Sequence, residues 1–236
     1  LRHDQALLDE LADLDVQQLR MKADTDYLDL LPPLKLSGFK ALSTARQRNL
    51  LQYLIRPVTI YPLPDERVRE WLRQENAVTG TTQARLEHEN LLLTLHDGRM
   101  HFLAAHREIN APGRQITWRT DTPLVLPELG LELSLCESGT RIIPDLENLA
   151  FSPGDPLCVH WRQGGERVRM PGEGFSRPLK KILQERRVAP WLRRSMPLVS
   201  CDGHVIWSAV LGDFSPSLVD ASGRIYSFEL ITRKVN

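Results

Sequence analysis

The hydrophobic period of this sequence changes from helical to strand near residue 85, and that change constrains the fold more than any other feature. Before it, leucines recur every three or four residues over 7–19, the spacing of one helix face. After it, two apolar runs flank Asp97-Gly98, a dipeptide that tolerates the positive φ of a type I′ turn. The sequence therefore predicts helices followed by a β-hairpin.

Three helices are expected before the hairpin. The first covers residues 1–19 and is acidic. The second runs to Ile55 from a cap at Ser43 or Thr44, because a hydroxyl can accept a free N–H of the first turn. The third begins near Asp65, where an acid complements the positive end of the helix dipole.

The last third of the chain mixes both kinds of element. A strand is expected over 157–161, a helix capped by Ser176 follows, Asp202-Gly203 marks a second hairpin, and 225–231 supplies a closing strand. The predicted class is α+β: a mainly helical N-terminal region with a β-hairpin, then a small mixed α/β C-terminal domain with hairpins.

Prolines and weak periodicity indicate where the chain divides. Pro32-Pro33 interrupts the helical pattern, and residues 136–153 hold two prolines and little periodicity. The expected parts are a linker helix with its connection (1–40), a middle domain (41–150) and a C-terminal domain (151–236).

Composition excludes several classes. Lys and Arg balance Asp and Glu at 30 each, and no apolar run reaches about 18 residues, so no membrane-spanning helix is expected. No secretory signal is visible, and the chain opens at Leu1 inside a helix, as a fragment would. Cys136, Cys158 and Cys201 form no CxxC pair, which favours reduced thiols and a cytoplasmic location.

Motifs of catalysis are absent from the sequence. It has no GxxxxGK[ST], GxGxxG, HExxH or GxSxG, and no Ser-Gly-Gly-x-Asp-Ser loop of ATP pyrophosphatases. His96, His101 and His106 are five apart, which sends neighbours on a strand to opposite faces. We expect no catalytic residue, cofactor site or metal site within this chain.

A local excess of positive charge is the main functional signal. Residues 160–197 hold ten Lys or Arg against three Asp or Glu, although the whole chain is neutral. Such an excess is typical of a surface that binds a polyanion.

Within that stretch, particular residues fit phosphate groups. Arg167 and Arg169 are two apart, which on a strand places both planar guanidiniums on one face. Lys180 and Lys181 fall in the first turns of the expected helix, where folding alone would not select cations.

Glycines of the same stretch, and tryptophans in or near it, also suit the binding of a nucleic acid. The turns at 164–165 and 171–174 allow backbone N–H groups to approach a phosphate as a nest. Trp161, Trp191 and Trp207 could stack on unpaired bases, although buried packing is the more frequent role of tryptophan. The alternative for the whole stretch is two hairpin turns and a solvated charged helix.

An ordered set of short motifs in this stretch is specific to one family. The set comprises Gln163-Gly164-Gly165-Glu166-Arg167, Pro171-Gly172, Leu179-Lys180-Lys181, Gln184-Glu185, Val188-Ala189-Pro190-Trp191-Leu192-Arg193 and Met196-Pro197-Leu198. It resembles the C-terminal domain of the bacterial tRNA(Ile)-lysidine synthetase family. The helix from Ala45-Arg46-Gln47-Arg48 to Ile55-Arg56 is similar, more loosely, to that family's substrate-recognition domain.

This resemblance implies a function. The family's enzymes have an N-terminal ATP-pyrophosphatase domain that uses ATP with Mg, and lysine, to convert the wobble cytidine of tRNA(Ile) with a CAU anticodon to lysidine. The chain would then be the tRNA-binding part, with 41–150 and 151–236 contacting tRNA and the catalytic domain as a partner; a homodimer is left open. The candidate tRNA-binding residues are Arg167, Arg169, Lys180, Lys181, Arg193, Arg46 and Arg48.

Two other readings stay open. The chain can be a protein-interaction or structural module without RNA binding, in which the acidic first helix docks the catalytic domain. A free-standing enzyme of another class has no motif to support it. Of the three hypotheses, only the tRNA-binding part of a lysidine-forming enzyme predicts saturable, salt-sensitive binding of tRNA.

Overall fold

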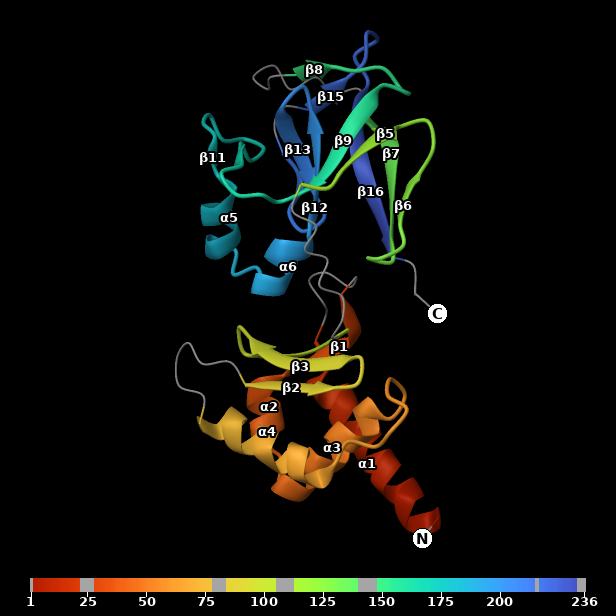
Figure 1. Cartoon of the computed structure of the whole chain (residues 1–236), viewed down its shortest axis with the longest axis vertical. Coiled ribbons are helices and arrows are strands. Elements are labelled where there is room, and N and C mark those ends of the chain that lie inside the picture. The colour runs from red at the N-terminus through yellow and green to blue at the C-terminus, as the bar shows by residue number, and fades with distance from the viewer. Residues whose placement is uncertain are drawn as a thin grey trace. The chain divides into compact units, whose positions relative to one another are not determined.

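The computed structural model describes residues 2–21, 28–77, 84–104, 113–139, 148–214 and 217–232. The chain divides into two compact units, Leu1–Arg107 and Glu108–Asn236. The elements of both units are labelled in Figure 1. Within the described ranges, none of the helices combines the length and the apolar character needed to cross a membrane.

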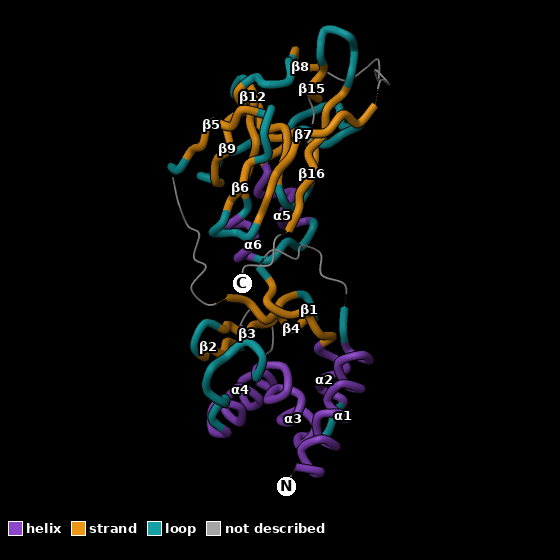
Figure 2. The backbone as a smooth tube through the Cα atoms, turned by 90° about the vertical axis from the view of Figure 1, so that its right-hand side faces the viewer, coloured by secondary structure: helices purple, strands orange, loops and turns teal. Residues whose placement is uncertain are grey.

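The N-terminal unit consists of helices and one antiparallel sheet. Its elements are α1 (Arg2–Leu19), β1 (Asp29–Lys35), α2 (Leu36–Ala41), α3 (Thr44–Ile55), α4 (Asp65–Ala77), β2 (Arg85–His88), β3 (Leu91–His96) and β4 (Arg99–Ala104). The strand order is β1-β4-β3-β2. The helices gather on one side of this sheet in both Figure 1 and Figure 2.

The predicted hairpin is confirmed. Strands β3 and β4 pair from His96 and Arg99 outward, and the turn between them has φ of 46° at Asp97 and 72° at Gly98. Positive φ at both positions is what a type I′ turn requires. The hairpin forms the centre of the four-stranded sheet, because β1 and β2 add one strand on each side.

The helical pattern stops before Pro32-Pro33, as expected, because α1 ends at Leu19 and both prolines lie inside strand β1. This strand is at the edge of the sheet, where it pairs with β4, and its register shifts between Leu31 and Leu34. On its other side the carbonyl oxygen of Pro33 accepts the N–H of Met21 at 2.8 Å, and Leu34 forms an isolated bridge with Arg20. Proline has no N–H to donate, so an edge strand with an irregular register accommodates it.

The helix boundaries follow the predicted signals. The hydroxyl of Ser43 accepts a hydrogen bond from the backbone N–H of Arg46 at 3.4 Å, and α3 ends at Ile55. Helix α4 begins at Asp65 as expected. Its Trp71 is buried, with its ring 5.8 Å from that of Phe39 in an edge-to-face arrangement, so α4 and α2 share the core beneath the sheet.

The C-terminal unit is mostly strands. Its elements are β5 (Gln115–Arg119), β6 (Leu124–Leu126), β7 (Leu131–Gly139), β8 (Asn148–Ala150), β9 (Pro156–Trp161), β10 (Arg167–Val168), β11 (Arg177–Pro178), α5 (Leu179–Glu185), α6 (Pro190–Ser195), β12 (Pro197–Cys201), β13 (His204–Ser208), β14 (Gly212–Asp213), β15 (Ser217–Val219) and β16 (Ile225–Thr232). They form two five-stranded sheets, β14-β13-β12-β9-β5 and β6-β7-β16-β15-β8, and the small hairpin β10-β11.

An aromatic cluster joins the two large sheets. The ring of Phe228 on β16 lies 6.1 Å from that of Trp118 on β5 and 5.6 Å from that of Trp207 on β13. Trp118 and Trp207 are both buried. The two sheets therefore share one core, and the predicted α+β class is confirmed for the chain.

The division of the chain falls well before the boundary expected near residue 150. Strand β5 pairs with β9 from Gln115 to Arg119, and β7 pairs with β16 along its whole length. Because these pairings are long-range, periodicity along the sequence does not reveal them. The assignment of residues 41–150 and 151–236 to separate steps of tRNA recognition stays a prediction.

Candidate nucleic-acid interface

The basic stretch forms one continuous part of the C-terminal unit. It leaves strand β9 at Trp161, makes the β10-β11 hairpin, and continues through α5 and α6 to strand β12. In Figure 1 the β11 hairpin, α5 and α6 lie at one edge of this unit, beside the sheet that contains β12 and β13.

Arg167 and Arg169 flank Val168, which is 2% exposed. Strand β10 ends at Val168, so the strand period applies to Arg167 and Val168, and Arg169 is half-buried beyond the strand. Arg167 is exposed, and its Nη2 donates to the carbonyl oxygen of Ser176 at 2.6 Å. That bond fixes the spacing of the two strands of the hairpin.

The expected cap at Ser176 is wrong. Helix α5 begins at Leu179, its N-cap is Pro178, and no side chain accepts a bond there. Residues Arg177 and Pro178 are instead strand β11, and the N–H of Leu179 donates to the carbonyl oxygen of Glu166 at 2.8 Å. The first of the free N–H groups of this helix is thus satisfied by a backbone carbonyl of the hairpin instead of by a hydroxyl cap.

Helix α5 presents two lysines to solvent. Leu179, Ile182 and Leu183 are buried, as predicted, so Lys180 and Lys181 lie on the outer side of the helix and are exposed. Within the described ranges, neither lysine forms an ion pair or a side-chain hydrogen bond. Two adjacent ammonium groups without a carboxylate partner are available for an external anion.

The glycine turn at 164–165 already holds an anion of the protein itself. The Glu166 Oε1 accepts the backbone N–H of Gln163 at 2.5 Å and that of Gly164 at 2.6 Å. Gly164 and Gly165 have φ of 98° and 89°, a region that glycine adopts without strain. The expected phosphate nest is therefore corrected: in this structure a carboxylate fills it.

Arg193 is partly buried and used by the fold. Its Nε donates to the carbonyl oxygen of Val188 at 2.6 Å, which stabilises the connection between α5 and α6. Burial, and then the nearby positive charge of Arg162, lower the pKa of Arg193 from its usual value. A cation held in this way contributes to the electrostatic potential more than to direct contacts.

The tryptophans are mainly packing residues. Trp161 is 1% exposed and Trp207 is 3% exposed, so neither offers a free ring face. The guanidinium of Arg114 lies 5.0 Å above the Trp161 ring. Trp191 is half-buried at the start of α6. Stacking on a base is therefore excluded for Trp161 and Trp207 in this conformation.

The two candidate arginines of the N-terminal unit have carboxylate partners. Arg46 pairs with Asp15 of α1, and Arg48 Nη2 lies 2.5 Å from Oδ2 of Asp65. The bond from Arg48 lowers the pKa of Asp65. Their role in tRNA binding stays a prediction, and both bonds would compete with it.

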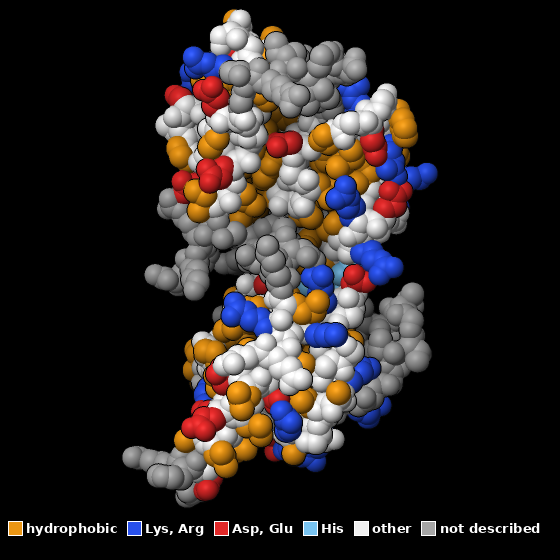
Figure 3. All heavy atoms as spheres, turned by 180° about the vertical axis from the view of Figure 1, so that it is seen from behind, with side chains coloured by type: hydrophobic (Ala, Val, Ile, Leu, Met, Phe, Trp, Pro, Cys, Tyr) orange, Lys and Arg blue, Asp and Glu red, His pale blue; other side chains and the backbone are white. Residues whose placement is uncertain are grey.

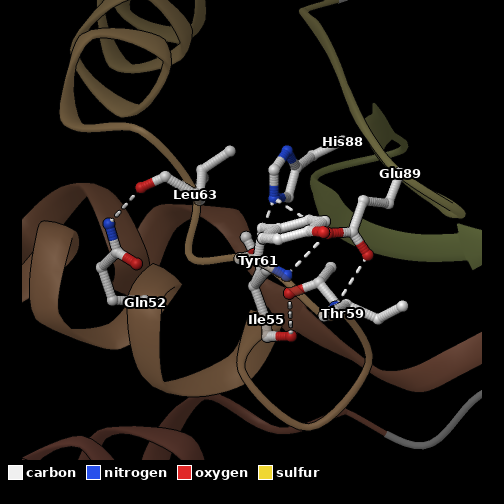
Figure 4. Close-up of polar contacts among 8 residues, drawn as sticks. Gln52, Ile55, Thr59, Tyr61, Leu63, His88 and Glu89 are labelled. Atoms are coloured by element: carbon white, nitrogen blue, oxygen red, sulfur yellow. Dashed lines mark hydrogen bonds and ion pairs between the residues drawn. The ribbon is translucent and has the colours of Figure 1, made fainter.

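A clamped loop in the N-terminal unit was not foreseen from the sequence. Figure 4 shows the carboxylate of Glu89 accepting the backbone N–H groups of Ile60 and Tyr61, both at 2.7 Å. The Nε2 of His88 lies 2.9 Å from the carbonyl oxygen of Tyr61. The bonds from the N–H groups of Ile60 and Tyr61 lower the pKa of the Glu89 carboxyl group. No local signal connects residues so far apart in the sequence.

This loop forms one wall of a hollow of about 760 Å³ next to α3. Its Ile60 is 85% exposed and its Tyr61 is 69% exposed. The arginines that line the hollow, Arg48 and Arg56, are both paired with carboxylates. Paired charges make this hollow a weaker site for a polyanion than the lysines of α5.

The charged groups of the C-terminal unit are interspersed on the face in Figure 3, where Lys and Arg side chains lie close to Asp and Glu side chains. Within the basic stretch, Arg177 pairs with Glu173 and Glu185. The net positive charge of the stretch is thus concentrated in the residues without such partners, among them Lys180 and Lys181.

Comparison with known proteins matches both units to one family. A model described as the TilS substrate binding domain matches residues 34–101, and one described as the TilS substrate C-terminal domain matches residues 157–214. The second range includes the β10-β11 hairpin and α5. Two matched domains that handle a substrate place the chain in the class of substrate-binding parts of enzymes.

Relatives agree with this class. The tRNA(Ile)-lysidine synthase of Nitrosomonas europaea is 31% identical over 210 residues, covering 87% of this chain and 42% of the relative. That of Pseudomonas aeruginosa is 33% identical over 206 residues, covering 84% of this chain and 41% of the relative. The chain belongs to the tRNA(Ile)-lysidine synthase family, so the resemblance seen in its motifs is confirmed.

The chain spans about two fifths of the length of the curated relatives it matches. A solved structure titled "Crystal structure of TILS C-terminal domain" matches half of the chain at 21% identity with a TM-score of 0.36, which is too weak a likeness to bear on the fold.

Proposed function

We propose that this chain is the part of a lysidine-forming ligase that binds and positions tRNA. The observation that carries the proposal is the pair of exposed, unpartnered lysines on α5, inside the range matched by the TilS substrate C-terminal domain. Arg167 on strand β10 is exposed and adds a cation to the same stretch of chain, and Arg169, half-buried just beyond that strand, stays a candidate.

The proposed role divides the work between this chain and the rest of the protein. An ATP-pyrophosphatase domain would use ATP with Mg to activate C2 of the wobble cytidine, and lysine would then attack that carbon. This chain would hold the tRNA(Ile) with the CAU anticodon in place, in the cytoplasm. Contacts of Lys and Arg with phosphates supply affinity and register, whereas discrimination between tRNAs needs base edges or shape.

The candidate residues differ in what they can contribute. Lys180, Lys181 and Arg167 are exposed and suit direct contact with phosphates. Arg193 is partly buried, and Arg46 and Arg48 are paired with carboxylates, so a contact with tRNA would require those bonds to be exchanged.

A second candidate, a docking module without RNA binding, is favoured by one observation on α1. Leu7 and Leu14 lie one heptad apart and are 67% and 62% exposed. A row of exposed leucines on a helix suits contact with another protein surface.

Binding of the 236-residue chain to tRNA separates the two candidates. Affinity would be measured for transcribed tRNA(Ile) with a CAU anticodon and for elongator methionine tRNA, at two salt concentrations. The proposed function predicts saturable binding that weakens with salt, and tighter binding of tRNA(Ile) if recognition lies partly in this chain. No binding to either tRNA would support the docking module.

A further inference from the structure

One aromatic side chain of the C-terminal unit, Phe175, is exposed to solvent and takes no part in the hydrophobic core. Phe175 is 65% exposed and lies in the loop between β10 and β11. Among the described residues of 157–214, it is the only large apolar side chain that is exposed. This ring is therefore not part of a contiguous apolar patch of the kind that marks a protein-docking surface.

The loop that carries Phe175 is held on its N-terminal side by a tight turn. The N–H of Glu173 donates to the carbonyl oxygen of Met170 at 3.0 Å, and Gly172 has a φ of 83°. Proline at the second position and a glycine of positive φ at the third are typical of a type II turn. This turn ends two residues before the ring.

The same loop is held on its C-terminal side by two arginines. Arg167 Nη2 donates to the carbonyl oxygen of Ser176, the residue after Phe175, at 2.6 Å. Arg177 Nη1 donates to Glu173 at 3.4 Å, and Arg177 also pairs with Glu185 of α5. Phe175 is thus presented by a backbone that is fixed on both sides, which lowers the entropy lost when the ring binds a partner.

Cations flank this ring along the chain. Arg167 donates a hydrogen bond to the carbonyl oxygen of Ser176, the residue after Phe175. Strand β11 then leads directly into α5, whose first turn carries Lys180 and Lys181. An exposed aromatic ring within six residues of cations that have no carboxylate partner suits single-stranded nucleic acid, in which bases stack on rings while cations bind the backbone.

We infer that Phe175 stacks on an unpaired base of the bound tRNA, while the lysines of α5 contact its phosphates. This inference rests on the proposed function and adds to it a side chain that contacts a base of the tRNA instead of its backbone. It also replaces the stacking role considered for Trp161 and Trp207, whose rings are buried.

The test compares substitutions of Phe175 in the full chain with transcribed tRNA(Ile) as the probe, at a series of salt concentrations. Phe175→Ala should raise the dissociation constant about tenfold at every salt concentration, without changing the salt slope, because no charge is removed. Phe175→Trp should bind at least as tightly as the natural chain. Phe175→Leu should bind as weakly as Phe175→Ala, since leucine keeps the apolar volume but has no π face.

Two controls separate this inference from the proposed function. Val125→Ala shortens another exposed apolar side chain of the same unit, 44% exposed on β6, and should leave binding unchanged. Unchanged melting temperatures would show that each variant folds, which is expected for an exposed ring. If the natural chain binds tRNA and Phe175→Ala binds equally well, or if Phe175→Leu keeps full affinity, the stacking role is overturned while the proposed function stands. If the natural chain itself does not bind tRNA, the proposed function fails.

Discussion

The guanidinium of Arg46 on α3 pairs with the carboxylate of Asp15 on α1, and that carboxylate is 1% exposed. Arg46 Nε lies 3.2 Å from Oδ2, and Nη2 donates to Oδ1, so the pair is bidentate. A buried carboxylate needs such a partner, because the loss of its hydration is costly. The acidic first helix is therefore attached to the core of the N-terminal unit partly through its charge.

Arg46→Ala should destabilise the N-terminal unit, because it leaves Asp15 buried without a counter-ion. We expect the free energy of unfolding to fall by about 2–3 kcal/mol, below the full cost for a buried pair since Arg46 is itself partly exposed. Chemical denaturation followed by circular dichroism measures this change.

The double variant Arg46→Ala with Asp15→Asn serves as the control for that prediction. It removes the unpaired charge and should recover part of the lost stability. Should Arg46→Ala keep the natural stability and weaken tRNA binding instead, the arginine would serve the RNA rather than the fold.

Glu89→Gln should loosen the loop that exposes Ile60 and Tyr61. The carboxylate accepts two backbone N–H groups, and an amide oxygen is a weaker acceptor without the negative charge. Hydrogen exchange of these two amides should be several-fold faster in the variant. Exchange of the Leu93 amide in the central strand β3 serves as the internal control and should not change.

The effect of Glu89 should also depend on pH. Its pKa is lowered below the ordinary value of 4.5, first by the bond from Ile60 and then by that from Tyr61. A lowered pKa in the folded state means that the stabilisation is complete above the ordinary pKa and is lost as the pH falls through the lowered one. The difference between the natural chain and Glu89→Gln should therefore be constant near neutral pH and disappear in acid. A difference that grew towards acid would contradict the assigned bonds.

Gly98→Ala should cost about 1 kcal/mol of stability from backbone strain alone. Gly98 has a φ of 72°, and a Cβ built there meets no atom within 4 Å, so no steric clash adds to the cost. Thermal unfolding measures the change. Gly174→Ala is the matched control, since that site is equally open and lacks the positive φ, and its stability should stay close to that of the natural chain.

Local signals in the sequence were sufficient for the elements that local interactions determine. The Ser43 cap, the start of α4 at Asp65 and the Asp97-Gly98 turn each depend on residues within one turn of the chain. The order of strands in the sheets does not depend on local signals, because β5 pairs with β9 and β8 pairs with β15 across long stretches of sequence. The division between the two units was misplaced for that reason.

The candidate site shows the same limit. Arg167, Lys180 and Lys181, which the charge excess singled out, are exposed, whereas Arg169 is half-buried; the role of these residues in tRNA binding stays a prediction. The partners of the charged groups were not predictable, because Glu166 occupies the glycine turn and Arg46 reaches a carboxylate on another helix. The exposed ring of Phe175 and the buried rings of Trp161 and Trp207 could be told apart only in the structure, because residue type and spacing in the sequence do not reveal which aromatic side chain is exposed.

The salt dependence of tRNA binding tests the central claim most directly. The double variant Lys180→Ala with Lys181→Ala would be compared with the natural chain, and Arg67→Ala with Arg69→Ala on α4 would remove the same charge from the other unit. If the lysines of α5 contact phosphates, the first variant should bind more weakly and lower the slope of log K against log salt by about 1.4–1.8, while the second should keep the natural slope. An unchanged affinity and slope in the first variant would contradict the assignment of the tRNA-binding surface to α5.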